Sequence, residues 1–170
     1  SQGGPVAIRY PRGGTTDNAY QEKFSEGEQI PALELKPGRD GVIFAVGHMV
    51  DVALEAARLL EPEYSCGVVN IRSLKPLDES LLLKLARGTR YVLTLEDHVL
   101  AGGMGSSILE LLSEQPGIKV QRLGYPDQFI PQGSIPQLHE AYGLTAQQVA
   151  NTFRKAMSGG VYQLVASPEK

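Results

Sequence analysis

Apolar residues occur along this chain in two alternating patterns, short continuous runs and stripes at helical spacing. The runs at 42–46, 66–71 and 91–95 have the length and composition of strands that are buried on both faces of a sheet. After the first run, apolar residues recur at helical spacing over 50–60, with charged residues on the opposite side. Strand alternating with helix in this way predicts a parallel sheet with helices on both faces.

Weaker patterns extend this core at both ends. Residues 32–35 predict a short strand that pairs antiparallel at one edge, and 120–123 predict the last strand. A short helix is expected over 135–142, and Thr145 is a typical N-cap for a final helix. Residues 158–170 are expected to form a flexible tail.

The N-terminal part differs in character from the rest. Residues 5–10 predict a strand, and residues 13–31 are polar, contain glycine and have no period. A structureless loop of that length is unusual inside a compact domain. We therefore expect three parts: 1–12 as the tail of a preceding domain, 13–31 as a linker, and 32–157 as an α/β domain.

Composition narrows the classes of partner and site. The chain is 42% hydrophobic and 21% charged with a net charge of −3, so neither nucleic acid nor an anionic membrane is an expected partner. No apolar run approaches the roughly 20 residues that span a bilayer. The single cysteine, Cys66, excludes an intrachain disulfide and a cysteine-rich zinc site, and it is interpreted as a buried packing residue.

Residues 96–106 join the third buried run to a helical pattern. The glycines at this junction, Gly102, Gly103 and Gly105, could present backbone N–H groups to an anion. Their spacing is not that of a dinucleotide-binding loop or a P-loop. The favoured interpretation is close packing between helix and strand, or against another subunit.

Titratable residues cluster at the same junction. Glu96, Asp97 and His98 could be an acid–base group, but adjacent strand residues point to opposite faces, so both acids cannot serve one site. We favour the interpretation that these three residues are solvated charges that also cap the following helix. His48 could face the same crevice as Glu96 if their strands are neighbours, although an N-cap or solvent-facing position is favoured. His139 is assigned no role, and no metal-binding spacing is recognised.

Several segments resemble one known family. Residues 4–13, 70–78, 96–106 and 123–134 are similar to the last third of 1-deoxy-D-xylulose-5-phosphate synthases, which are transketolase-like enzymes. The segments Arg-Tyr-Pro-Arg-Gly and Pro-Asp-Gln-Phe-Ile-Pro-Gln-Gly are the more specific ones. The resemblance implies a three-layer α/β/α fold whose five-stranded, mostly parallel sheet has an antiparallel edge strand.

The same resemblance implies a function for the whole enzyme. The family uses thiamine diphosphate and Mg²⁺ to condense pyruvate with glyceraldehyde 3-phosphate, releasing CO₂, in isoprenoid precursor and thiamine biosynthesis. It implies that Arg12 binds the phosphate of the aldehyde. It also implies a cytoplasmic homodimer, with the plastid stroma as the alternative location. From the residues alone, Arg9 and Arg12 are surface charges or phosphate ligands.

Some family motifs are missing from the chain. The Gly-Asp-Gly…Asn motif for Mg²⁺ and diphosphate is absent, as is the segment with the activating glutamate. The chain is therefore interpreted as a C-terminal part that binds no cofactor and is inactive alone, with the rest of the same enzyme as its partner. The alternatives are the C-terminal domain of a 2-oxoacid dehydrogenase β-subunit or of a transketolase, or a free-standing dimerisation or binding module.

Overall fold

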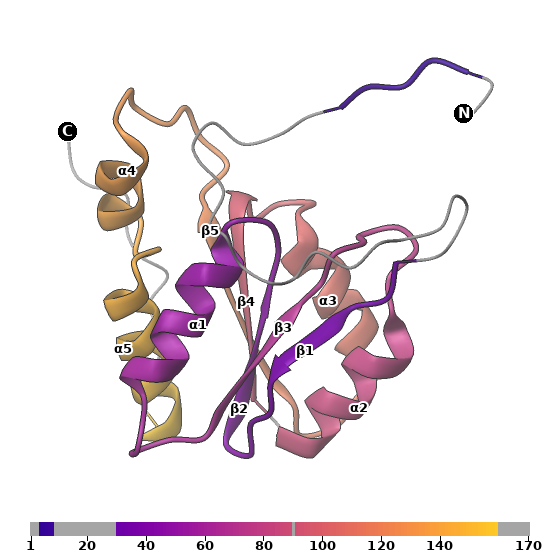
Figure 1. Cartoon of the computed structure of the whole chain (residues 1–170), viewed down its shortest axis with the longest axis vertical. Coiled ribbons are helices and arrows are strands. Elements are labelled where there is room, and N and C mark those ends of the chain that lie inside the picture. Colours follow the sequence, from indigo (N-terminus) through magenta and orange to yellow (C-terminus); the bar gives the residue numbers. More distant parts are fainter. Residues whose placement is uncertain (1–3, 9–29, 90, 160–170) are drawn as a thin grey trace.

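The fold was examined in a computed structural model, which describes residues 4–8, 30–89 and 91–159 (Figure 1). The strands in this part are β1 (Leu33–Lys36), β2 (Gly41–Ala45), β3 (Cys66–Asn70), β4 (Tyr91–Val99) and β5 (Lys119–Tyr125). The helices are α1 (Met49–Leu59), α2 (Glu79–Thr89), α3 (Met104–Leu112), α4 (Ile135–Ala141) and α5 (Ala146–Met157).

The five strands form one sheet in the order β1-β3-β2-β4-β5. The pairs β2–β3, β2–β4 and β4–β5 are parallel, whereas β1 pairs antiparallel with β3 at the edge. Every residue of β2 is buried, as expected for a central strand that is covered on both faces. The predicted mixed α/β sheet with an antiparallel edge strand is confirmed.

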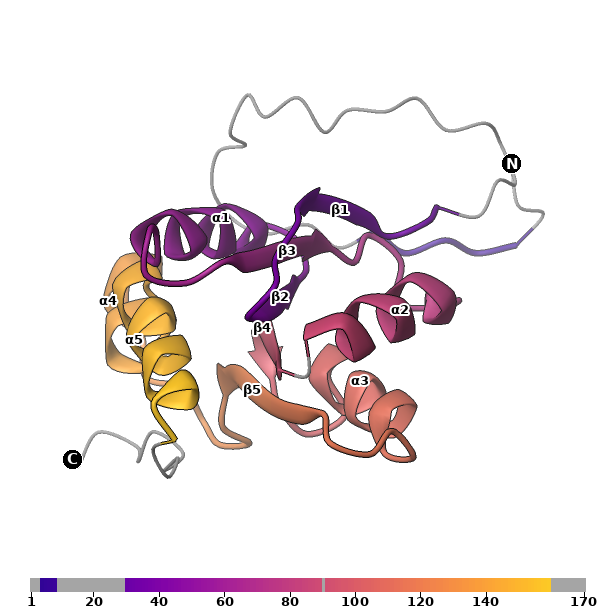
Figure 2. The same cartoon turned by 90° about the horizontal axis from the view of Figure 1, so that it is seen from below.

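Helices cover both faces of the sheet, so the fold has three layers (Figure 2). Because side chains alternate along a strand, Ile43 and Ala45 pack into the core beneath α1 and α5. Val42 and Phe44 pack into the opposite core, beneath α2 and α3. Helix α4 lies on the same side as α1 and α5. Among the described residues, no helix is long and apolar enough to cross a membrane.

Two segments differ from the sequence-based expectation. Strand β4 continues to Val99, beyond the predicted end at Leu95, because Val99 still pairs with Tyr125 of β5. The strand predicted over 5–10 is wrong for residues 5–8, which pair with no strand of the described chain, and its last two residues lie outside the described part. The proposed division at 12 and 31 stays a prediction.

Candidate functional site

The strand order reverses between β2 and β4. From β2 the chain passes through α1 to β3 on one side, and from β3 it returns through α2 to β4 on the other side of β2. Ligand sites of open α/β sheets form beyond the carboxyl ends of the strands at such a point. Here β2 ends at Ala45 and the parallel β4 pairs with it up to Leu95. The residues that follow both positions are therefore the first candidates for a site.

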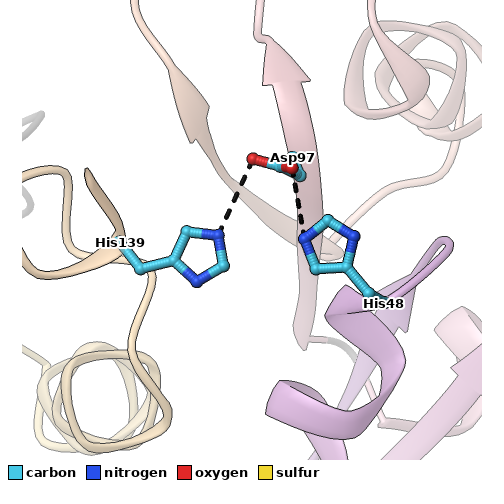
Figure 3. Close-up of side chains that lie close together, drawn as sticks. All are labelled: His48, Asp97 and His139. Atoms are coloured by element: carbon cyan, nitrogen blue, oxygen red, sulfur yellow. Dashed lines mark ion pairs between the residues drawn. The ribbon is translucent and has the colours of Figure 1, made fainter. Parts of the chain in front are cut away.

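Three side chains meet at this reversal point: His48, Asp97 and His139 (Figure 3). His48 Nε2 lies 3.1 Å from Asp97 Oδ2, and His139 Nε2 lies 3.7 Å from Asp97 Oδ1. The two imidazole rings are stacked, with centroids 5.8 Å apart and planes 8° apart. We call these three residues the His-Asp-His cluster.

Each member of the cluster is positioned by the end of a secondary structure element. His48 is the N-cap residue of α1, and Gly47 before it has a φ of 61°, a turn that favours glycine. Asp97 lies near the end of β4, and His139 lies in the last turn of α4. The His48 side chain makes no capping hydrogen bond, so its ring is free to face Asp97.

The nitrogens of the cluster are buried without hydrogen-bond partners. Nε2 of His48 and Nε2 of His139 are both closed to solvent, and neither makes a hydrogen bond in the described part of the chain. Each of these nitrogens instead forms an ion pair with Asp97, at 3.1 Å for His48 and 3.7 Å for His139. Burial lowers the pKa of His139; the nearby Asp97 carboxylate opposes this shift, and His48 adds to it.

Two tyrosines, Tyr125 and Tyr142, lie near the Asp97 carboxylate. Burial raises the pKa of Tyr125, and the nearby charge of Asp97 raises it further. Tyr142 packs edge-to-face on Tyr125, with ring centroids 5.1 Å apart. Outer groups of this kind orient a carboxylate toward a third group.

Glu96 points away from this cluster, as the alternation along β4 requires. It is 1% exposed, and its carboxylate accepts hydrogen bonds from the backbone N–H groups of Met104 (2.7 Å) and Gly105 (2.8 Å). The capping role is thus present, but Glu96 is buried rather than solvated. The hypothesis that His48 and Glu96 share one crevice is wrong, because β4 turns Glu96 toward α3 and Asp97 toward His48.

The glycines allow this internal cap. A Cβ on Gly105 would lie 2.6 Å from Thr94 Oγ1 and 3.0 Å from Glu96 Oε1, and one on Gly103 would also collide with Glu96. The N–H of Gly102 donates to Ser106 Oγ at 3.1 Å. The anion at this helix N-terminus is therefore the chain's own carboxylate, and the interpretation of close packing fits the geometry.

The other candidate residues lie apart from the cluster. His98 is exposed, and its Nδ1 lies 3.1 Å from the carbonyl oxygen of Val99. Arg12 lies outside the described residues. Sequence analysis did not identify His139 as a site residue. It also did not predict that Asp97 would form ion pairs with both histidines. The three members of the cluster are far apart in sequence, so no spacing pattern could have connected them.

Two imidazoles and one carboxylate allow two kinds of chemistry. One ligand atom from each of the three side chains lies within 4.8 Å of the others, which suits a shared metal ion. Without a metal, imidazoles beside a carboxylate are the groups that general acid–base catalysis uses.

Comparison with known proteins identifies relatives over most of the chain. The family described as "Transketolase, C-terminal domain" matches residues 31–149. The 1-deoxy-D-xylulose-5-phosphate synthase of Heliobacterium modesticaldum is 46% identical over 155 residues, which cover 89% of this chain but only 24% of the relative. The synthase of Caldanaerobacter subterraneus is 43% identical over 87% of this chain and 24% of its own length. The chain thus spans about a quarter of the length of these relatives.

Solved structures agree on the fold. A split-gene transketolase, described as an inactive β4 tetramer, is 41% identical with a TM-score of 0.69, over 86% of this chain and 48% of that one. A mutant transketolase of Pichia stipitis has a TM-score of 0.57 at 22% identity, over 82% of this chain and 20% of that one, and bears on the fold alone. By the match over residues 31–149, this chain belongs to the transketolase C-terminal domain family.

Proposed function

We propose that this chain is the C-terminal part of a 1-deoxy-D-xylulose-5-phosphate synthase. The whole enzyme would condense pyruvate with glyceraldehyde 3-phosphate and release CO₂. The observation that carries the proposal is the 46% identity to such a synthase over 89% of the chain. The 24% of the relative that is covered agrees with a terminal portion of a longer enzyme.

Thiamine diphosphate and Mg²⁺ would be bound by the rest of the enzyme. The glycine-rich helix N-terminus of this chain does not fit a diphosphate, because the Glu96 carboxylate already accepts hydrogen bonds from the N–H groups of Met104 and Gly105. A second anion there would be repelled by Glu96 and has no room beside the glycines. We therefore derive no catalytic step through the cofactor in this chain.

The contribution of the chain to substrate binding would come from Arg12. Its guanidinium could hold the aldehyde phosphate through two parallel hydrogen bonds. This role rests on the segment Arg-Tyr-Pro-Arg-Gly, and it would place residues 1–12 with the preceding domain.

The α/β domain itself would serve assembly with the upstream domains and with a second copy. The loop before α4 and the first residue of that helix support this role, since Phe129 in the loop is fully exposed and Ile135 is 38% exposed. Phenylalanine is among the aromatic residues that are enriched in the buried centres of protein interfaces. The description of the split-gene relative as a β4 tetramer also supports association through chains of this kind.

A chimera tests the proposal. The C-terminal quarter of the Heliobacterium modesticaldum synthase would be replaced by this chain, and pyruvate decarboxylation that depends on glyceraldehyde 3-phosphate would be measured. We expect activity in the chimera and none in the chain alone. A folded chimera without synthase activity would overturn the proposal. Ketol transfer between sugar phosphates in its place would favour the transketolase alternative.

Arg12 is tested in the same chimera. Arg12→Ala should raise KM for glyceraldehyde 3-phosphate by about tenfold or more, because a charged hydrogen bond contributes about 1.5–3 kcal/mol. Arg39→Ala is the matched control, since Arg39 lies exposed in the turn before β2. An unchanged KM in the Arg12 variant would remove the assignment.

A further inference from the structure

We propose that His48, Asp97 and His139 form a binding site for a zinc ion. The site would lie at the reversal point of the strand order and would join the start of α1, the end of β4 and the last turn of α4. It does not depend on the synthase activity proposed above. Its function would be to hold α4 against the sheet.

The separations of the ligand atoms support a shared ion. In a tetrahedral zinc site, metal–ligand distances of about 2.0–2.2 Å place neighbouring ligand atoms about 3.3 Å apart. Here the two His–Asp separations are 3.1 and 3.7 Å, and all three ligand atoms lie within 4.8 Å of one another. Binding of the ion would draw the ligand atoms closer together by rotation of the side chains.

The burial of the nitrogens points to a missing partner. The His139 side chain is only 10% exposed, and its Nε2 makes no hydrogen bond within the described chain. His48 Nε2 is in the same state. Buried polar atoms are nearly always satisfied, so two such nitrogens directed at one carboxylate need an explanation. A cation between them would satisfy both nitrogens and the carboxylate together.

The surroundings fit a metal site. Figure 3 shows the two rings directed at the Asp97 carboxylate from different elements. Tyr125 lies close enough to Asp97 for the carboxylate charge to raise the pKa of the tyrosine, and outer groups of this kind orient ligating carboxylates. The side chains of His48 and Asp97 are each 31% exposed, which leaves an entry path and room for a water ligand.

The donor set selects the kind of metal. Mg²⁺ and Ca²⁺ prefer oxygen ligands, whereas two imidazoles and one carboxylate suit zinc and its neighbours among the transition metals. Three protein ligands leave the fourth position open for water. Because its three ligands come from the start of α1, the end of β4 and the last turn of α4, an ion bound here would link these elements.

The experiment is a calorimetric titration of the tag-free, EDTA-treated chain with ZnCl₂. We expect one zinc ion per chain with a Kd of about 10 μM or tighter, a rise in Tm with zinc, and no competition from excess Mg²⁺. Asp97→Asn and His139→Gln should each weaken binding by at least about tenfold. Absence of binding at about 100 μM zinc would overturn the proposal.

His98→Gln is the matched control, because His98 is the remaining one of the three histidines of the chain and neighbours Asp97 but lies exposed. It should leave the affinity unchanged. Should a variant fail to fold, the imidazole ¹⁵N resonances of the unmutated chain decide the question. Zinc should shift the Nε2 signals of His48 and His139 and leave those of His98 in place; any other pattern contradicts the site.

Discussion

The backbone N–H of Gly105 donates a 2.8 Å hydrogen bond to the buried carboxylate of Glu96. The strand that ends at the junction thus supplies the anion for the helix that begins there. This contact accounts for the buried acid and for the glycine at that position.

Replacement of Glu96 by Gln should destabilise the fold. Gln has nearly the same shape as Glu, but it lacks the negative charge that accepts hydrogen bonds from two backbone N–H groups. Its NH₂ group would also face one of these two donors. We expect the free energy of unfolding to fall by about 1–3 kcal/mol, measured by urea denaturation. Glu110→Gln on the exposed side of α3 is the control and should change it by less than about 0.5 kcal/mol.

Replacement of Gly105 by Ala should be costly, whereas the same change at Gly88 should not. The new Cβ at 105 would lie 2.6 Å from Thr94 Oγ1 and 2.9 Å from Arg122 Cδ, so we expect a loss of about 1–3 kcal/mol. Gly88 lies within α2 and has no atom within 4 Å of its Cβ position. Alanine there should stabilise the chain by up to about 1 kcal/mol. Thermal unfolding of both variants compares them, and equal effects would contradict the packing interpretation.

Phe153 should contribute far more to stability than Phe129. Phe153 is fully buried and packs edge-to-face on Tyr91 at a centroid distance of 5.2 Å, whereas Phe129 is fully exposed. Phe153→Ala should lower the free energy of unfolding by about 3–5 kcal/mol. Phe129→Ala should leave the stability of this chain nearly unchanged in the same denaturation assay. A large loss in the Phe129 variant would mean that the residue packs within the chain.

Cys66 should be unreactive in the native chain. Burial raises the pKa of its thiol to about 12, so almost no thiolate exists at pH 8. A disulfide reagent should modify it only slowly at pH 8, and completely after unfolding in guanidinium. Rapid modification of the native chain would contradict the buried position.

The same thiol predicts a pH dependence of stability. Its pKa is raised on folding, from an ordinary value of 9.0 to about 12, so the unfolded state releases the proton first. Its contribution is therefore fully present below pH 9 and is lost as the pH rises from about 9 to about 12. Cys66→Ala should show a smaller decrease in stability over that range, as measured by urea denaturation at a series of pH values.

Much of the fold could be predicted because its signals are local. The buried run at 42–46 and the helical stripe over 50–60 each reflect burial of neighbouring residues, and the structure contains both elements, with one-residue differences at their ends. The extension of β4 to Val99 could not be predicted, because it depends on pairing with Tyr125. The strand over 5–10 failed at residues 5–8 because a strand requires a neighbour.

The candidate site could be predicted from the sequence only in part. Alternation along a strand correctly separated Glu96 from Asp97, but it could not tell which acid faces His48. No sequence pattern indicated His139 as a site residue, because it comes close to Asp97 only when α4 packs near the end of β4. Contacts of this kind depend on tertiary packing and produce no periodic pattern in the sequence.

The order in which the cluster residues occur along the chain has a consequence for biosynthesis. His48, Asp97 and His139 follow one another at long intervals, and the last of them lies beyond every strand of the described sheet. During synthesis, every strand of the described sheet therefore leaves the ribosome before His139 does. The cluster can be completed only when α4 has emerged, together with the rest of the domain.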